Sequence, residues 1–158
     1  MLSLTRNVNE GRTHDLGATL AVEIDRLDFR SALVIEEATA LRGSIVQLLK
    51  KRGWIAHGVR AAGQAFPLLK CIPYHLIVID GNASNIAAIN FARTLHNTEE
   101  WNRIPLVIIT DSPNESLTSN LKETGVYSAK RSTWLSDLTK TLADLEARGH
   151  WSKQPYAN

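Results

Sequence analysis

The sequence has only one cysteine and no long apolar segment, and both shortages limit what the protein can be. With Cys71 as its single cysteine, the chain cannot form an internal disulfide, which favours a reducing compartment. No apolar run approaches the ~20 residues of a membrane span. The first six residues lack the apolar core of a secretory signal. We therefore expect a cytoplasmic protein that does not associate with a membrane.

An excess of charge of one sign is also lacking. Lys and Arg total 18 and Asp and Glu total 16, so the net charge is only +2. Such a balance does not call for a nucleic-acid partner. The five histidines are scattered without the spacing of metal ligands. There is no phosphate-binding Walker loop and no nucleophile–histidine–acid set, so we do not expect an enzyme.

What the sequence does contain is a regular alternation of short apolar runs with helical patterns. Hydrophobic residues make up 44% and charged residues 22%, as in ordinary globular domains. The apolar runs, each of strand length, span residues 31–35, 54–59, 75–80, 105–110 and 126–130. Because strands separated by helices pair in parallel, this pattern predicts an α/β fold with five parallel strands and five helices.

The alternation also sets the expected domain boundaries. Residues 1–28 are polar and irregular, and we interpret them as an N-terminal extension. Residues 29–148 contain all the strand and helix patterns and form one domain, with its last helix beginning near Ser132 or Thr133 as N-cap. Residues 149–158 form a C-terminal tail. No helix-turn-helix or enzyme motif flanks the domain.

Polar residues close four of the predicted strands. Glu36 and Glu37 follow the first strand, and Asp80, Thr110 and Lys130 end the third, fourth and fifth. The carboxyl ends of parallel strands meet at one edge of the sheet, where ligands bind in such folds. Three carboxylates there repel one another unless a cation such as Mg²⁺ neutralises them. Carboxylates, a cation, a lysine and a hydroxyl together indicate a site for phosphoryl transfer.

In these residues the chain resembles the receiver domain of two-component response regulators, the family that includes CheY, over about residues 30–146. The order of an acidic pair, an acceptor Asp, a Thr and a Lys matches the family pattern. Asp80 follows Glu36 by 44 residues, Thr110 follows Asp80 by 30, and Tyr127 lies three residues before Lys130. The resemblance implies a CheY-like (flavodoxin-like) three-layer α/β/α sandwich with strand order 2-1-3-4-5.

The resemblance also implies a mechanism. A histidine kinase or phosphotransfer protein donates a phosphoryl group to Asp80. Mg²⁺ is held by Glu36, Glu37, Asp80 and the backbone carbonyl of Asn82. The protein is then a single-domain response regulator that signals through an output protein of unknown identity.

Three further residues gain roles from the same resemblance. Lys130 is expected to pair with the phosphoryl oxygens and Thr110 to hydrogen-bond to them. Tyr127 is expected to turn inward as a switch, which changes the surface around the last strands and helices. Receivers often pair through that face, so a homodimer is possible on family grounds.

Several positions depart from the family pattern and keep an alternative open. Asp111 stands where a small residue is usual, Arg131 replaces a cis-linked proline, and Ser84 replaces a proline in the loop after Asp80. These changes favour a pseudo-receiver, which binds proteins without being phosphorylated. A flavodoxin-like nucleotide or flavin binder is disfavoured, because the acidic turn after the first strand repels phosphate.

Overall fold

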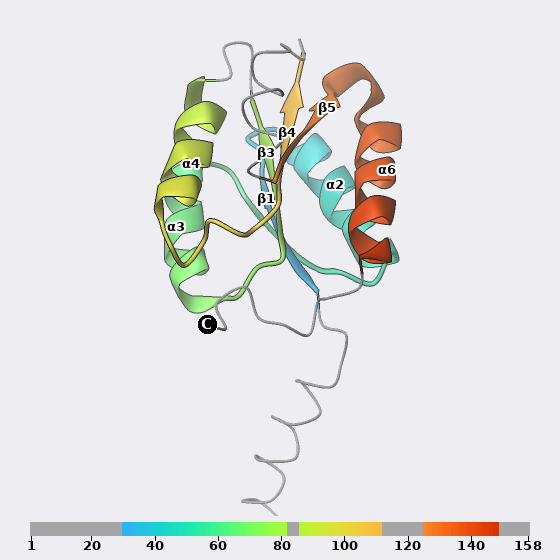
Figure 1. Ribbon diagram of the computed structural model, residues 1–158. Helices are drawn as coiled ribbons and strands as arrows, with labels where there is room; N and C mark the ends of the chain where they lie inside the picture. The colour runs from blue at the N-terminus through green and yellow to red at the C-terminus, as the bar shows by residue number, and fades with distance from the viewer. Residues whose placement is uncertain (1–29, 82–85, 112–124, 149–158) are drawn as a thin grey trace, which may run out of the picture.

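A computed structural model describes residues 30–81, 86–111 and 125–148. Five strands form one sheet in the order β2-β1-β3-β4-β5, and every neighbouring pair is parallel (Figure 1). The strands are β1 (Ser31–Ile35), β2 (Ile55–Val59), β3 (Leu76–Asp80), β4 (Leu106–Thr110) and β5 (Val126–Lys130). Their bounds differ from the expected runs by at most one residue. The expected parallel sheet and its strand order are therefore confirmed.

Helices cover both faces of the sheet. The described residues hold four α-helices: α2 (Thr39–Lys51), α3 (Ala62–Cys71), α4 (Ile86–Asn97) and α6 (Trp134–Ala147). In Figure 1, α3 and α4 lie on one side of the sheet, and α2 and α6 lie on the other. The helix expected after Asp111 and the extension 1–28 fall outside the described residues. In the described ranges, no helix is both long enough and apolar enough to cross a membrane.

The junction between β5 and α6 differs from the expected direct start of a helix. A short 3₁₀ helix, η2 (Arg131–Thr133), comes first, and Thr133 then takes the N-cap position of α6. The Thr133 hydroxyl does not cap a backbone N–H but donates to the Asp137 carboxylate at 2.9 Å. The same carboxylate accepts the backbone N–H of Lys130 at 2.9 Å. Asp137 thus joins the end of β5 to the first turn of α6.

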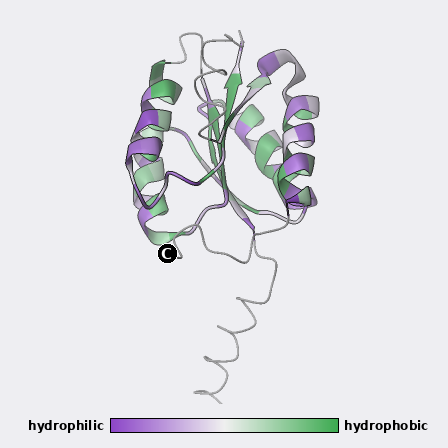
Figure 2. Ribbon diagram, in the orientation of Figure 1, coloured by the Kyte–Doolittle hydropathy of each residue, from purple (hydrophilic) through white to green (hydrophobic). Residues whose placement is uncertain are grey.

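The sheet separates two hydrophobic cores, because successive strand residues point to opposite faces. Leu33, Ile77 and Ile108 belong to the core shared with α3 and α4, whereas Val34 and Val78 belong to the core shared with α2 and α6. Figure 2 shows the apolar sheet between helices whose polar residues face outward. Strands buried on both faces explain why the sequence shows continuous apolar runs rather than alternation.

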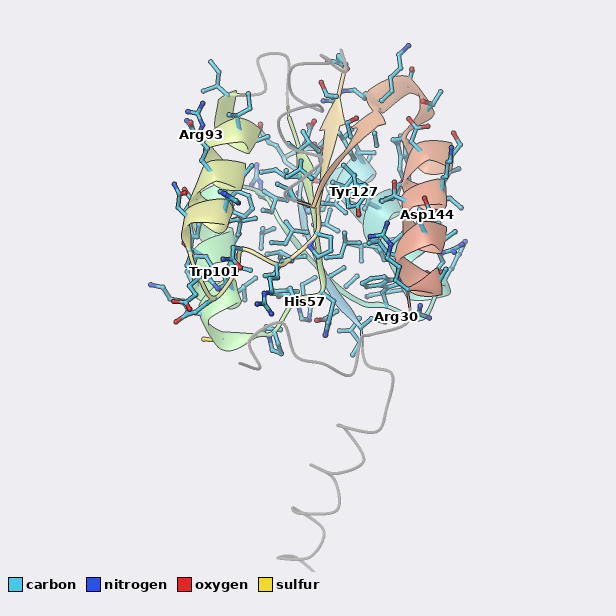
Figure 3. All side chains as sticks on the ribbon, viewed as in Figure 1. Arg30, His57, Arg93, Trp101, Tyr127 and Asp144 are labelled. Atoms are coloured by element: carbon cyan, nitrogen blue, oxygen red, sulfur yellow. The ribbon has the colours of Figure 1, made fainter. Side chains whose placement is uncertain are left out.

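A polar cluster lies at the edge of the sheet where the strands begin, opposite their carboxyl ends. The Glu146 carboxylate accepts two hydrogen bonds from the Arg52 guanidinium, at 3.0 and 2.6 Å, and one from the Trp54 indole at 3.1 Å. Arg30 lies 3.6 Å from the same carboxylate and stacks over Trp54 (Figure 3). The cluster joins the end of α2, the start of β2 and the last turn of α6.

Helix α2 ends at a left-handed glycine, as its sequence predicts. Gly53 has φ +85°, a conformation that strains residues with a Cβ. The Gly53 and Trp54 N–H groups donate to the carbonyls of Lys50 and Leu49, each at 3.0 Å. The turn brings the chain directly into β2 and aligns Ile55 with Ser31 of β1.

Candidate functional site

The polar residues that close the strands gather at one edge of the sheet. Asp80, Thr110 and Lys130 are the last residues of β3, β4 and β5, and Glu36 follows β1 directly. All five strands run in the same direction, so these residues share the carboxyl edge. Glu36 and Thr110 are buried, while Glu37 and Lys130 are exposed.

Glu36 and Asp80 form a close pair of carboxyl groups. The register pairs Ile35 of β1 with Ile79 of β3, and each acid follows its own member of that pair. Neighbouring strands lie about 4.8 Å apart, so the two side chains extend side by side. The side chain of Asp80 is only 7% exposed and Glu36 is only 3% exposed. Water therefore screens the charges of the two carboxyl groups poorly.

The environment of Glu36 raises its pKa from 4.5 to about 7. Burial is the largest cause, because it penalises the charged form. The hydrogen bond with the Asp80 carboxyl is the second cause, and the N–H of Ala38 and the charge of Arg131 oppose both. One oxygen, Oε1, accepts the Ala38 N–H at 2.9 Å, and the buried Oε2 has no donor among the described residues. A hydrogen bond between the Glu36 and Asp80 carboxyl groups forms only when one of the two carries a proton.

The turn that positions Glu36 is held by Arg42 of α2. Its guanidinium donates to the backbone carbonyls of Glu36 at 2.8 Å and of Glu37 at 3.2 Å. The Arg42 stem crosses β2 at Gly58, where a Cβ atom would lie 3.0 Å from it. A glycine at this position thus allows the close approach that fixes the acidic turn.

The positive partner of Asp80 is Arg131, the first residue of η2. The Arg131 Nη2 donates to Asp80 Oδ1, and Nε donates to Asp111 Oδ1 at 2.7 Å. Arg131 is 31% exposed and Asp111 is 56% exposed, so the guanidinium bridges a buried and an exposed carboxylate. The hydrogen bond to Asp80, with the further bond to Asp111, raises the pKa of Arg131 despite its burial.

Lys130 lies beside this pair but takes no part in it. Among the described residues, the Lys130 ammonium forms no ion pair, and its backbone N–H bonds to Asp137. Strand alternation gives the reason. Ala129 of β5 belongs to the same core as Val78 of β3, so Asp80 and Arg131, each two residues further along, share that face. The side chain of Lys130, one residue away, belongs to the opposite face of the sheet.

Of two other expected residues, Thr110 lies at this carboxyl edge, whereas Tyr127 lies near the start of β5. Thr110 is buried and lies opposite Lys130 in the register of β4 and β5. Tyr127 of β5 is half-buried against the core beneath α6, and its hydroxyl lies 3.4 Å from the Arg148 Nη1 (Figure 3). Asn82 lies outside the described residues.

A cleft opens over the acidic strand ends. It has a volume of about 380 Å³ and is lined by Glu37, Arg60 and Asp80, with apolar residues from β1, β3, α3 and α4 forming the remainder. Asp80 is therefore reached from solvent although most of its side chain is buried. The cleft brings an exposed arginine and an exposed carboxylate to the entrance of the site.

With Arg131 in place, the described residues leave no open position for a Mg²⁺ ion at Asp80. In residues 30–81, 86–111 and 125–148, no three His, Cys, Asp or Glu side chains come close enough to hold a metal. The unpartnered Oε2 of Glu36 is a suitable oxygen ligand, but Oδ1 of Asp80 is already bonded to Arg131. The charge that the sequence suggests for a metal is supplied here by a side chain.

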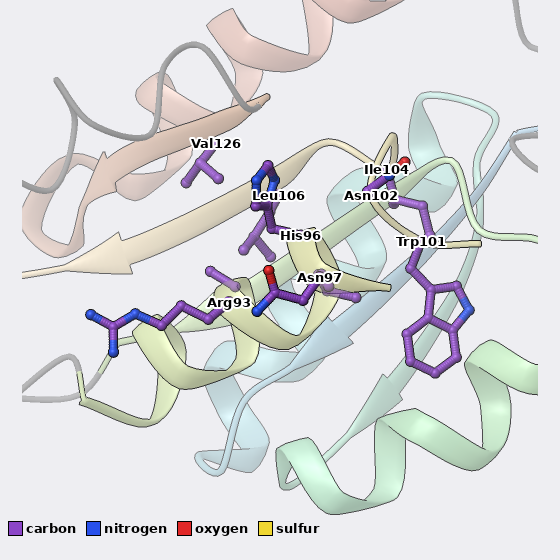
Figure 4. A pocket seen from close by; sticks show the side chains of 10 residues that line it. Arg93, His96, Asn97, Trp101, Asn102, Ile104, Leu106 and Val126 are labelled. Atoms are coloured by element: carbon purple, nitrogen blue, oxygen red, sulfur yellow. The ribbon is translucent and has the colours of Figure 1, made fainter. Parts of the chain in front are cut away.

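A second pocket lies away from the strand ends. Its volume is about 170 Å³, and it is bordered by the C-terminal half of α4 and by the starting residues of β4 and β5, Leu106 and Val126 (Figure 4). His96 and Arg93 line it from α4, and Trp101 from the loop that follows. Trp101 is buried in the core rather than exposed to a partner. The pocket therefore belongs to the opposite edge and adds nothing to the Asp80 site.

Comparison with solved structures identifies the fold. No protein-family model and no curated protein sequence matches the chain. The chemotaxis response regulator CheY4 of Vibrio cholerae matches with a TM-score of 0.64 and 14% identity, over 74% of this chain and 98% of that one. The chain has the CheY-like receiver fold.

Two receiver domains of other proteins match equally well. The receiver domain of a histidine kinase from Syntrophus aciditrophicus gives a TM-score of 0.64 at 16% identity, over 77% of this chain and 92% of that one. The receiver domain of the Francisella response regulator 1452 gives 0.64 at 17%, over 75% and 98%. The likeness covers nearly the whole of each of these domains, although the sequence identity is low.

Proposed function

We propose that the protein is a receiver-type signalling domain in which Asp80 accepts a phosphoryl group. The observation that carries the proposal is the position of Asp80. It ends the central strand β3 of a receiver fold, lines an open cleft, and lies between a buried carboxyl group, Glu36, and a guanidinium, Arg131. A carboxylate in this position can act as a nucleophile, and the groups around it can respond to the charge of an added phosphoryl group.

The proposed chemistry is a simple displacement at phosphorus. An Asp80 carboxylate oxygen attacks the phosphorus atom of a phosphohistidine on a histidine kinase or phosphotransfer protein. A new P–O bond forms, the P–N bond breaks, and its electron pair leaves with the imidazole nitrogen, which takes a proton from solvent. The product is an aspartyl phosphate, whose added negative charge must be met by nearby donors and cations.

We propose that three side chains respond to that charge. Thr110 and Lys130 lie at the same sheet edge, and we propose that they reach the phosphoryl oxygens through a hydroxyl and an ammonium. Tyr127 packs under α6 and is proposed to move when Thr110 moves. These shifts would alter the β5–α6 surface, through which an output protein is proposed to read the signal.

Intact-mass measurement tests the proposal. The protein is incubated with acetyl phosphate, with and without Mg²⁺, beside Asp80→Asn as the matched control. We expect the wild-type chain to gain one phosphoryl group and the variant to gain none. No gain by a folded wild-type protein, from acetyl phosphate or from a phosphohistidine donor, would refute it.

The alternative is a pseudo-receiver, and one observation favours it. Arg131 already neutralises Asp80 and also binds Asp111, so the arrangement is satisfied without a phosphoryl group. In that case the domain binds its partner through a fixed surface. An Asp80→Asn variant that keeps partner binding unchanged, in a chain that takes up no phosphoryl group, would establish this alternative.

A further inference from the structure

The bridge from Asp80 through Arg131 to Asp111 suggests how the site controls its cation. We propose that Arg131 is a built-in counter-ion that competes with Mg²⁺ for Asp80, so that the metal binds only as Arg131 withdraws. This inference rests on the proposed function, because it concerns the regulation of the same phosphoryl-accepting site. It concerns binding alone and makes no claim about the rate of phosphoryl transfer.

Arg131 already occupies an Asp80 oxygen that a bound cation needs. A divalent cation needs direct contact with carboxylate oxygens, and Asp80 Oδ1 already accepts a hydrogen bond from Arg131 Nη2. The guanidinium also carries a positive charge at the position where the metal charge would lie. Two cations held against one buried carboxylate repel each other strongly in a poorly solvated site. Binding of one therefore opposes binding of the other.

Glu36 supplies a buried oxygen that is left without a hydrogen-bond partner among the described residues. Glu36 Oε2 is buried with no hydrogen-bond donor in the described part of the chain, next to Asp80. Native structures seldom leave such an oxygen unsatisfied. A buried carboxylate oxygen beside a second carboxyl group is a suitable ligand for a hard cation. Glu37 lines the cleft beside Asp80, while Arg131 already neutralises the Asp80 carboxylate.

Arg131 also has a second carboxylate partner, Asp111, outside the site. Its Nε bond to Asp111 uses the planar fork of the guanidinium, which a lysine ammonium cannot reproduce. Because Asp111 is largely exposed, this bond is weak and gives the guanidinium a solvent-facing position to retreat to. Arg131 is the first residue of η2, so we expect its withdrawal from Asp80 to shift the junction at which Asp137 joins β5 to α6.

Calorimetric titration of Mg²⁺ into the full chain tests the inference. Arg131→Gln removes the positive charge and keeps a side chain of similar length, and we expect it to bind Mg²⁺ about ten-fold more tightly than the wild type. Lys140→Gln makes the same change in net charge at an exposed position of α6 that belongs neither to the cleft nor to the Arg131 bridge, and it is expected to leave the affinity unchanged. Arg131→Lys keeps the charge and is expected to stay near the wild type.

The outcomes separate this inference from the proposed function. Equal Mg²⁺ affinities for wild type and Arg131→Gln, or no binding by either, would overturn the inference whatever the phosphorylation result. Tighter binding in both Arg131→Gln and Lys140→Gln would reduce the effect to net charge and also overturn it. Should Arg131→Gln fail to fold, the Mg²⁺ affinity of Arg131→Ala is measured in its place and compared with that of Arg131→Lys. Failure of phosphorylation with the expected affinities would refute only the proposed function.

Discussion

Replacing Glu36 by glutamine should stabilise the protein at high pH and leave its stability unchanged at low pH. Glu36 has a pKa of about 7 in the folded chain and an ordinary value of 4.5. The folded state therefore holds the proton more tightly than the unfolded state does. Stability contributed by the protonated group is complete below about pH 4.5 and is lost as the pH rises through 7.

The size of the effect follows from the pKa difference. Each unit corresponds to 1.36 kcal/mol, so a rise from 4.5 to about 7 sets an upper limit of about 3 kcal/mol at pH 8. Glutamine is neutral at every pH. Its oxygen can still accept the Ala38 N–H, and its amide N–H can donate to Asp80, as the protonated acid does.

Urea unfolding followed by tryptophan fluorescence at pH 4.5 and pH 8 measures the effect. Glu36→Gln should be more stable than the wild type at pH 8 by up to about 3 kcal/mol, and within about 0.5 kcal/mol of it at pH 4.5. Glu37→Gln is the matched control, because it makes the same chemical change at the exposed neighbouring position. A Glu36→Gln effect that is the same at both pH values would refute the reasoning.

Two other predictions concern the stability of the scaffold. Glu146→Gln should cost about 1–3 kcal/mol at neutral pH, because it weakens the bonds from Arg52 and Trp54. Burial opposes the charge of Glu146, but these bonds and the charges of Arg52 and Arg30 lower its pKa below 4.5. The cost of the substitution should therefore shrink as the pH falls through that lowered pKa. A cost that persists at pH 3 would contradict this. Leu142→Ala, in the core under α6, should cost about 2–5 kcal/mol in urea unfolding, and a cost under 1 kcal/mol would show that the core repacks.

The sheet was predictable because its signals are local. Five strands buried on both faces give continuous apolar runs, and helices between them leave only parallel pairing. The same reasoning places Glu36 and Asp80 at one edge, and the structure confirms that arrangement of the strands. The start of α6 was less predictable, because the Asp137 contacts that hold η2 connect residues seven apart and leave no periodic pattern.

The partner of Asp80 shows where a resemblance misses a signal that the residues contain. The family pattern directs attention to Lys130, and Arg131 is noticed only as a missing proline. Strand alternation carries the information: Ala129 faces the core that also lies below Asp80, and Arg131 continues that parity. The bridge to Asp111 could not be predicted, since it depends on the backbone of η2.

The most direct test of the central claim is the mass of the full chain after exposure to a phosphodonor. With acetyl phosphate, the account predicts one phosphoryl group on the wild-type protein and none on Asp80→Asn. It also predicts that alkaline treatment removes the group, as expected for an acyl phosphate. A phosphoryl group retained by Asp80→Asn, or none on folded wild type with either acetyl phosphate or a phosphohistidine protein, would contradict the account.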